Sequence, residues 1–120
     1  MGIDVYLNWN GQTQEEIAAQ LTGFSVVHGR VGYLREAYHG HPYGTKVLMP
    51  EAFDRDNCVI ASSTLKERLP ATLEAVAERE RTIYHHEIPD PETLKSFVDF
   101  VDLHERLEQD GKQPTITVSA

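Results

Sequence analysis

The segment from residue 32 to residue 44 carries the residue types best suited to chemistry in this chain. It holds three tyrosines, two histidines, an adjacent arginine and glutamate, and three glycines within thirteen positions. Glycine permits sharp backbone turns, while tyrosine and histidine combine a flat apolar body with a polar tip. This mixture favours a pocket or a binding surface. The candidate site residues are Tyr33, Arg35, Tyr38, His39, His41 and Tyr43.

The cations of this segment suggest an anion site. Arg35 and His39 would lie one turn apart if residues 33–39 formed a short helix, and would then present a cationic edge beside the tyrosines. Such an edge could bind a phosphate or a carboxylate. The alternative is a solvent-facing Arg35 that pairs with Glu36 or with a helix end.

Histidine spacing gives little support for a metal site. His39 with His41 and His85 with His86 form two close pairs, but a tetrahedral site needs three or four ligands. The sequence has no H-E-x-x-H or C-x-x-C motif, and nothing in it indicates that the two pairs meet. We therefore expect neither a metal nor another cofactor.

Two further residues have chemical potential but favour structural roles. His104 lies near the apolar stripe of the last long helix, which predicts a boundary histidine with one hydrogen-bonded nitrogen; the alternative is a pH-sensitive or site-lining group. Cys58 begins the apolar run 58–61, so we expect a buried, inert thiol. The P-loop, the G-x-S-x-G nucleophile elbow and the dinucleotide-binding G-x-G-x-x-G are missing.

Composition bounds the class of protein. The net charge is -8, from 11 basic and 19 acidic residues, so the chain lacks the basic footprint of a nucleic-acid binder. The N-terminus has neither a basic region nor a long apolar run, so we expect no membrane association and a cytoplasmic location. The 120 residues predict a single globular domain over residues 1–120.

Strands are expected at both ends of the chain. Ile3, Val5, Leu7 and Trp9 alternate with polar residues, as do Ile116 and Val118 within residues 115–119. Period-two alternation indicates half-buried strands, and we expect these two to share a sheet and one core. Residues 24–28 are expected to form a short strand, residues 45–49 to be extended, and residues 58–61 to form a short strand or to lead into a helix.

Capping patterns predict where the helices begin. Thr13 with Glu16 and Thr64 with Glu67 have capping-box spacing, and Asp90 precedes a proline and an acidic residue. The first box opens a short helix with Ile17, Ala18 and Leu21 inward and Gly23 as its C-cap. Long helices are expected over residues 64–83 and from Pro91 to Gly111. The fold class is therefore α+β: a largely antiparallel sheet that includes both terminal strands, packed on two long helices and one or two short ones.

Three functions remain open from the sequence. The first is a small binding or regulatory protein that recognises a protein partner or a small anionic ligand through residues 32–44. The second is a small hydrolase-like enzyme with His39 or His41 as general acid/base and Arg35 as anion clamp. The third is a structural role in an oligomer, such as a homodimer. A concave site with converging histidine and arginine would favour the enzyme, and tyrosines exposed on a flat patch would favour the binding protein.

Overall fold

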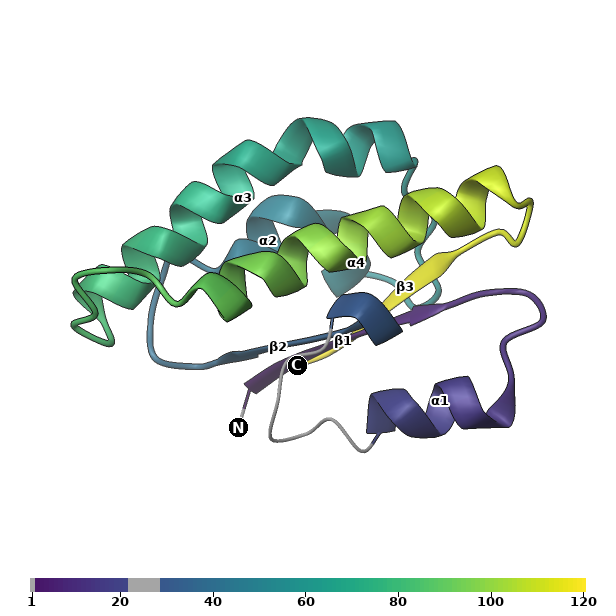
Figure 1. Cartoon of the computed structure of the whole chain (residues 1–120), viewed down its shortest axis with the longest axis horizontal. Helices are drawn as coiled ribbons and strands as arrows, with labels where there is room; N and C mark the ends of the chain where they lie inside the picture. Colours follow the sequence, from purple (N-terminus) through teal and green to yellow (C-terminus); the bar gives the residue numbers. More distant parts are fainter. Residues whose placement is uncertain (1, 22–28) are drawn as a thin grey trace.

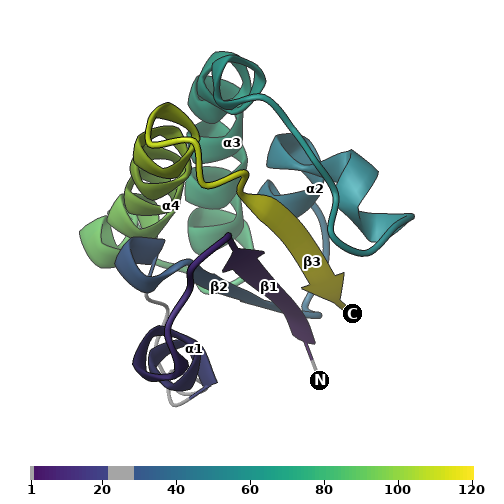
Figure 2. The same ribbon diagram turned by 90° about the vertical axis from the view of Figure 1, so that its right-hand side faces the viewer.

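A computed structural model describes residues 2–21 and 29–120. Its sheet, seen nearly edge-on in Figure 1, has three antiparallel strands in the order β2-β1-β3, which lie side by side in Figure 2. They are β1 (Gly2–Asn8), β2 (Tyr33–Ala37) and β3 (Thr115–Ser119). The N-terminal strand is therefore central and pairs with the C-terminal strand, which confirms the prediction that the two terminal strands share a sheet.

Helices cover one face of this sheet. Figure 2 shows α2, α3 and α4 together on one side of it, while α1 lies apart from them. The bounds are α1 (Gln14–Leu21), α2 (Gly44–Leu48), α3 (Ser62–Thr82) and α4 (Pro91–Gln109), with short 3-10 helices at Gly29–Val31 and Pro50–Phe53. The predicted α+β class is confirmed. Among the described residues, no helix is long and apolar enough to cross a membrane.

The core lies between the sheet and this helical layer. Ile3, Val5, Leu7 and Ile116 are fully buried. Trp9 and Val118 are partly buried and pack against the same core, with Phe97, Phe100 and Leu65 from the long helices. The pairing register places Val5 between Leu34 and Val118, so the inward faces of all three strands coincide.

Two segments adopt the opposite of their predicted structure. Residues 33–39 were expected to be helical, but residues 33–37 form β2, because Leu34 pairs with Val5 and is fully buried on the core face. Residues 45–49 were expected to be extended, but residues 44–48 form α2. In both cases a contact distant in sequence overrides the local pattern.

The first helix begins as predicted but faces the other way. Thr13 Oγ1 accepts from the N–H of Glu16 at 3.1 Å, and Glu16 Oε1 accepts from the N–H of Thr13 at 2.9 Å, which confirms the capping box. The predicted inward stripe is wrong, since Ala18 and Leu21 are exposed. Gln20 is buried instead, because its amide donates to the carbonyl of Leu7 at 2.7 Å. The predicted C-cap Gly23 and strand 24–28 lie outside the described residues.

Both long helices end one or two residues before the predicted position, and the predicted start of α3 is wrong. α3 begins at Ser62, so the expected capping box at Thr64 is wrong; the Ser62 N–H donates to Glu108 of α4 at 3.0 Å instead. Asp90 caps α4 as predicted and accepts from the N–H of Glu92 at 3.0 Å. Cys58 is buried, as expected, and forms an isolated bridge with Ile116 of β3.

His104 is a core residue rather than a boundary residue. It is fully buried in α4, and its Nδ1 lies 2.6 Å from Ser62 Oγ. No partner for Nε2 exists within the described part of the chain. Burial lowers the pKa of His104, against opposing effects of the Glu108 charge and the Ile60 backbone. The folded protein therefore favours the neutral imidazole.

This burial predicts a loss of stability in mild acid. Above the unfolded-state pKa of about 6.5 both states hold His104 neutral, so its contribution is fully present. As the pH falls below that value, the unfolded state binds a proton that the folded state resists, and stability declines toward the depressed folded pKa. Urea titrations between pH 7.5 and pH 5 should show a shallower decline for His104→Gln than for the wild type. Equal declines would contradict the assignment.

Candidate functional site

The loop between β2 and α2 (residues 38–43) meets the loop between α3 and α4 (residues 83–90) at the C-terminal end of α3. The rings of His39 and Tyr84 are 5.7 Å apart, edge to face, and Tyr84 lies 6.1 Å from His86. A Cβ built on Gly40 would lie 3.3 Å from the Ile83 side chain. The segment singled out in the sequence therefore contacts the segment that carries the second histidine pair.

Four of the six candidate residues lie in this region. The Tyr43 ring lies 6.1 Å from that of Tyr38 and 4.8 Å from that of His41, both edge to face. Tyr38, His39 and His41 are exposed, whereas Tyr43 is 8% exposed and belongs to the core. Tyr43 therefore supports the exposed rings from beneath, and its ring is not a surface feature.

The other two candidates, Tyr33 and Arg35, point to the opposite face of the sheet. Side chains alternate along a strand, and Leu34 faces the core, so its neighbours on both sides cannot. Tyr33 Oη donates to Asp4 Oδ1 at 2.6 Å, and Arg35 Nη1 pairs with the same oxygen at 2.8 Å. Neither the proposed partner Glu36 nor the helical pairing with His39 applies to Arg35, because residues 33–37 are a strand.

This cluster explains two shifted pKa values. Burial, and then the hydrogen bond to Asp4, raises the pKa of Tyr33 to about 12. The hydrogen bond with Tyr33, and then the charge of Asp4, raises the pKa of Arg35. The guanidinium of Arg35 is thus paired with the Asp4 carboxylate of the neighbouring strand. This pairing argues against a role for Arg35 as an anion clamp.

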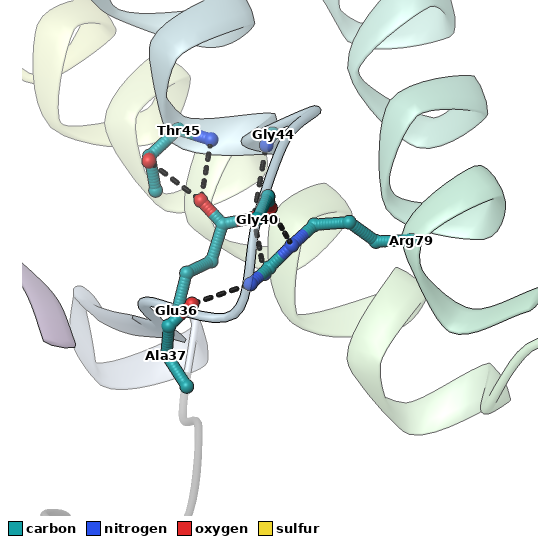
Figure 3. Close-up of polar contacts among 6 residues, drawn as sticks. All are labelled: Glu36, Ala37, Gly40, Gly44, Thr45 and Arg79. Carbon is teal, nitrogen blue, oxygen red and sulfur yellow. Dashed lines mark hydrogen bonds and ion pairs between the residues drawn. The ribbon is translucent and has the colours of Figure 1, made fainter. Parts of the chain in front are cut away.

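A buried ion pair holds the loop between β2 and α2 (Figure 3). Glu36 Oε2 accepts from the N–H of Gly44 at 2.9 Å, and Oε1 accepts from the N–H of Thr45 at 2.8 Å and from its hydroxyl at 2.6 Å. The carboxylate therefore satisfies the first N–H groups of α2, which have no partner within the helix. Arg79 of α3 lies 3.4 Å from Glu36 Oε2, and both side chains are about 95% buried.

Arg79 also fixes the loop directly. Its Nε donates to the carbonyl of Gly40 at 3.1 Å, and Nη2 donates to the carbonyl of Ala37. Its guanidinium lies 4.9 Å from the ring centroid of Tyr43 and 5.9 Å from that of Tyr84. One side chain thus contacts both loops, and it positions the rings that they carry.

A cavity of about 230 Å³ lies beside this anchor. Residues of β2, α3, the loop after α3 and the first turns of α4 line it, including Val76, Arg79, Glu80, Tyr84 and Phe97. The wall is thus apolar at its base and polar where α3 ends. Its volume falls below the roughly 300–1,000 Å³ of pockets that hold drug-sized ligands.

The polar part of this wall contains an oriented histidine. His86 Nδ1 lies 2.7 Å from Glu80 Oε2, and the His86 backbone N–H donates to the Glu80 carbonyl at 2.9 Å. The glutamate side chain is 9% exposed and the histidine side chain 54% exposed. A buried carboxylate therefore holds a half-exposed imidazole at the rim of the cavity.

The sequence did not reveal the residues that organise this region. Glu36 and Arg79 are charged residues within otherwise ordinary patterns, and their pairing across 43 positions has no local signal. His86 was visible as half of a pair, but its partner was not its neighbour His85; it was Glu80, six positions earlier in α3.

In comparisons with known proteins, no family model, curated protein or solved structure matches the chain. Among the described residues, no group of three or more histidine, cysteine, aspartate or glutamate side chains is placed to hold a metal ion. The function must therefore be inferred from the residues themselves.

Proposed function

We propose that this protein binds a protein partner through an exposed patch made by Tyr38, His39, His41 and Tyr84, here called the aromatic patch. The observation that carries the proposal is that the two loops meet through the rings of His39 and Tyr84 above one buried anchor, Arg79, which contacts the Tyr84 ring and the Gly40 carbonyl. Tyr38 is 42% exposed and Tyr84 38% exposed. Tyrosine is enriched among the residues that dominate binding energy at protein interfaces.

The anchoring supports binding because it lowers the entropic cost of association. Loops that order only on binding lose conformational freedom at that moment, which subtracts from affinity. Here three hydrogen bonds from Arg79 already fix residues 36–40 in the free protein. The adjacent cavity of about 230 Å³ is of a size to take one side chain of the partner.

A protein partner is better supported than a small anionic ligand. Arg35 pairs with Asp4, and Arg79 pairs with Glu36, so each arginine that lines the cavity already has a carboxylate partner. The cavity also contains Glu80, whose carboxylate would repel an anion. A second copy of the chain would be one such partner. Light scattering on the pure protein would then give the molar mass of a dimer.

A double substitution tests the proposal. Tyr38→Ala combined with Tyr84→Ala should remove a partner captured by the wild-type protein from extracts of the source cells, because it deletes both exposed tyrosine rings. Each exposed ring contributes little to the fold, so the free energy of unfolding should fall by under about 1.5 kcal/mol.

The matched control is Val59→Ala, which truncates another exposed apolar side chain outside the patch. Val59 is 78% exposed. This variant should capture the same partner in the same amount as the wild type. Capture that survives the double tyrosine substitution, or that is lost equally in the control, would refute the aromatic patch as the binding surface.

A further inference from the structure

The pair formed by Glu80 and His86 has the arrangement of a general base. A carboxylate carries no proton to donate, so a carboxylate of Glu80 at 2.7 Å places the imidazole proton of His86 on Nδ1. The lone pair is then on Nε2. Carboxylate-oriented histidines act as bases in this way, because the carboxylate fixes the tautomer and stabilises the imidazolium that forms.

The surroundings of the pair also fit catalysis. Glu80 is buried at the end of α3, and the backbone bond between the same two residues fixes the loop, so the imidazole is held from two directions. His86 lines the cavity with Arg79 and Thr93, which carry N–H and O–H donors, and with the apolar side chains of Val76 and Phe97. His39 and His41, by contrast, have no carboxylate partner among the described residues.

We propose that this cavity is a hydrolytic site for a small neutral ester, with His86 as the catalytic base and Glu80 as its positioning residue. A neutral carbonyl substrate fits because the arginines of the cavity are already paired. This activity goes beyond the binding of a protein partner, and it uses the same cavity that a side chain of the partner would enter.

The reaction needs only water as co-reactant. His86 Nε2 accepts a proton from water as the water oxygen bonds to the carbonyl carbon, and the carbonyl electron pair moves onto its oxygen. Arg79 and Thr93 both line the cavity, and their N–H and O–H groups are the donors assigned to that oxyanion. When the carbon–oxygen bond to the alcohol breaks, the departing oxygen takes the proton back from Nε2. An acid and an alcohol leave, and the imidazole is neutral again.

Hydrolysis of 4-nitrophenyl acetate tests this assignment. His86→Gln should lower kcat/KM by about 100-fold or more, the usual contribution of a positioned general base. The matched control is His85→Gln, which removes the adjacent exposed histidine and should leave the rate unchanged. His86 is half exposed, so circular dichroism should show that both variants keep the fold. Equal rates for the wild type, His86→Gln and His85→Gln would overturn the proposal.

A second measurement separates positioning from structure. Nitrogen-15 NMR at pH 8 should show the Nδ1–H tautomer for His86 in the wild type, and Glu80→Gln should lose that preference together with activity. An Nε2–H tautomer in the wild type would overturn the role of Glu80. Tyr38 belongs to the aromatic patch but does not line the cavity. The single variant Tyr38→Ala should therefore keep the wild-type esterase rate, and that rate distinguishes failure of the binding surface from failure of the catalytic site.

Discussion

Replacing Arg79 with alanine should lower the free energy of unfolding by about 3–5 kcal/mol, the usual cost of breaking a buried ion pair from one side. The change leaves the carboxylate of Glu36, 5% exposed, without its cation. It also removes the hydrogen bonds that Arg79 donates to the carbonyls of Ala37 and Gly40. Chemical denaturation followed by circular dichroism measures this loss directly.

The control for that experiment lies two positions further along the same helix. Arg81 is about half exposed and pairs with Glu78 at 3.4 Å. Exposed pairs of this kind contribute under about 1 kcal/mol, so Arg81→Ala should change stability little. The double variant Arg79→Ala with Glu36→Gln should lose less free energy of unfolding than the two single variants lose together, because the double variant leaves no unpaired buried charge. Similar losses for Arg79→Ala and Arg81→Ala would contradict the anchoring role.

Replacing Leu7 with alanine should lower the free energy of unfolding by about 2–5 kcal/mol. Leu7 is fully buried in the central strand and pairs with Ile116 of the C-terminal strand. Truncation would leave a cavity where the sheet meets the helical layer, and close-packed cores relax only partly around such a cavity. Urea titration at pH 7 checks the value.

Leu21→Ala provides the same chemical change at an exposed position. Leu21 is 48% exposed at the end of α1, so little apolar area is lost from the core. A loss under about 1 kcal/mol is expected there. If Leu7→Ala cost no more than this control, the central strand would not be the centre of the core.

The sequence predicted the elements whose own residues carry the pattern. Alternation in residues 3–9 and 115–119 reflects burial on one face only, and the Asp90-Pro91 start of α4 is a local capping signal. Such features require no knowledge of the rest of the chain. The paired terminal strands and the α+β class followed from them.

Residues 33–39 and 45–49 were mispredicted because contacts with residues outside each segment decide their structure. Leu34, Arg35 and Glu36 are all good helix formers, yet pairing with β1 makes this segment a strand. The following helix contains Thr45 and Val47 but begins where Glu36 accepts its first N–H groups. For the same reason the sequence indicated only part of the candidate site. Residue types pointed to the segment 32–44, but only the fold shows that Arg79 and Tyr84 contact it.

The most direct test of the aromatic patch is site-specific photocrosslinking in extracts of the source cells. A benzoylphenylalanine residue placed at position 38 lies within the patch. One placed at position 59 is exposed and lies outside the patch, next to Cys58, which forms a bridge with β3. The proposed function predicts one discrete crosslinked protein from position 38 and none from position 59. Identical products from both positions, or no product from position 38, would contradict the claim that this protein works by binding a partner through the aromatic patch.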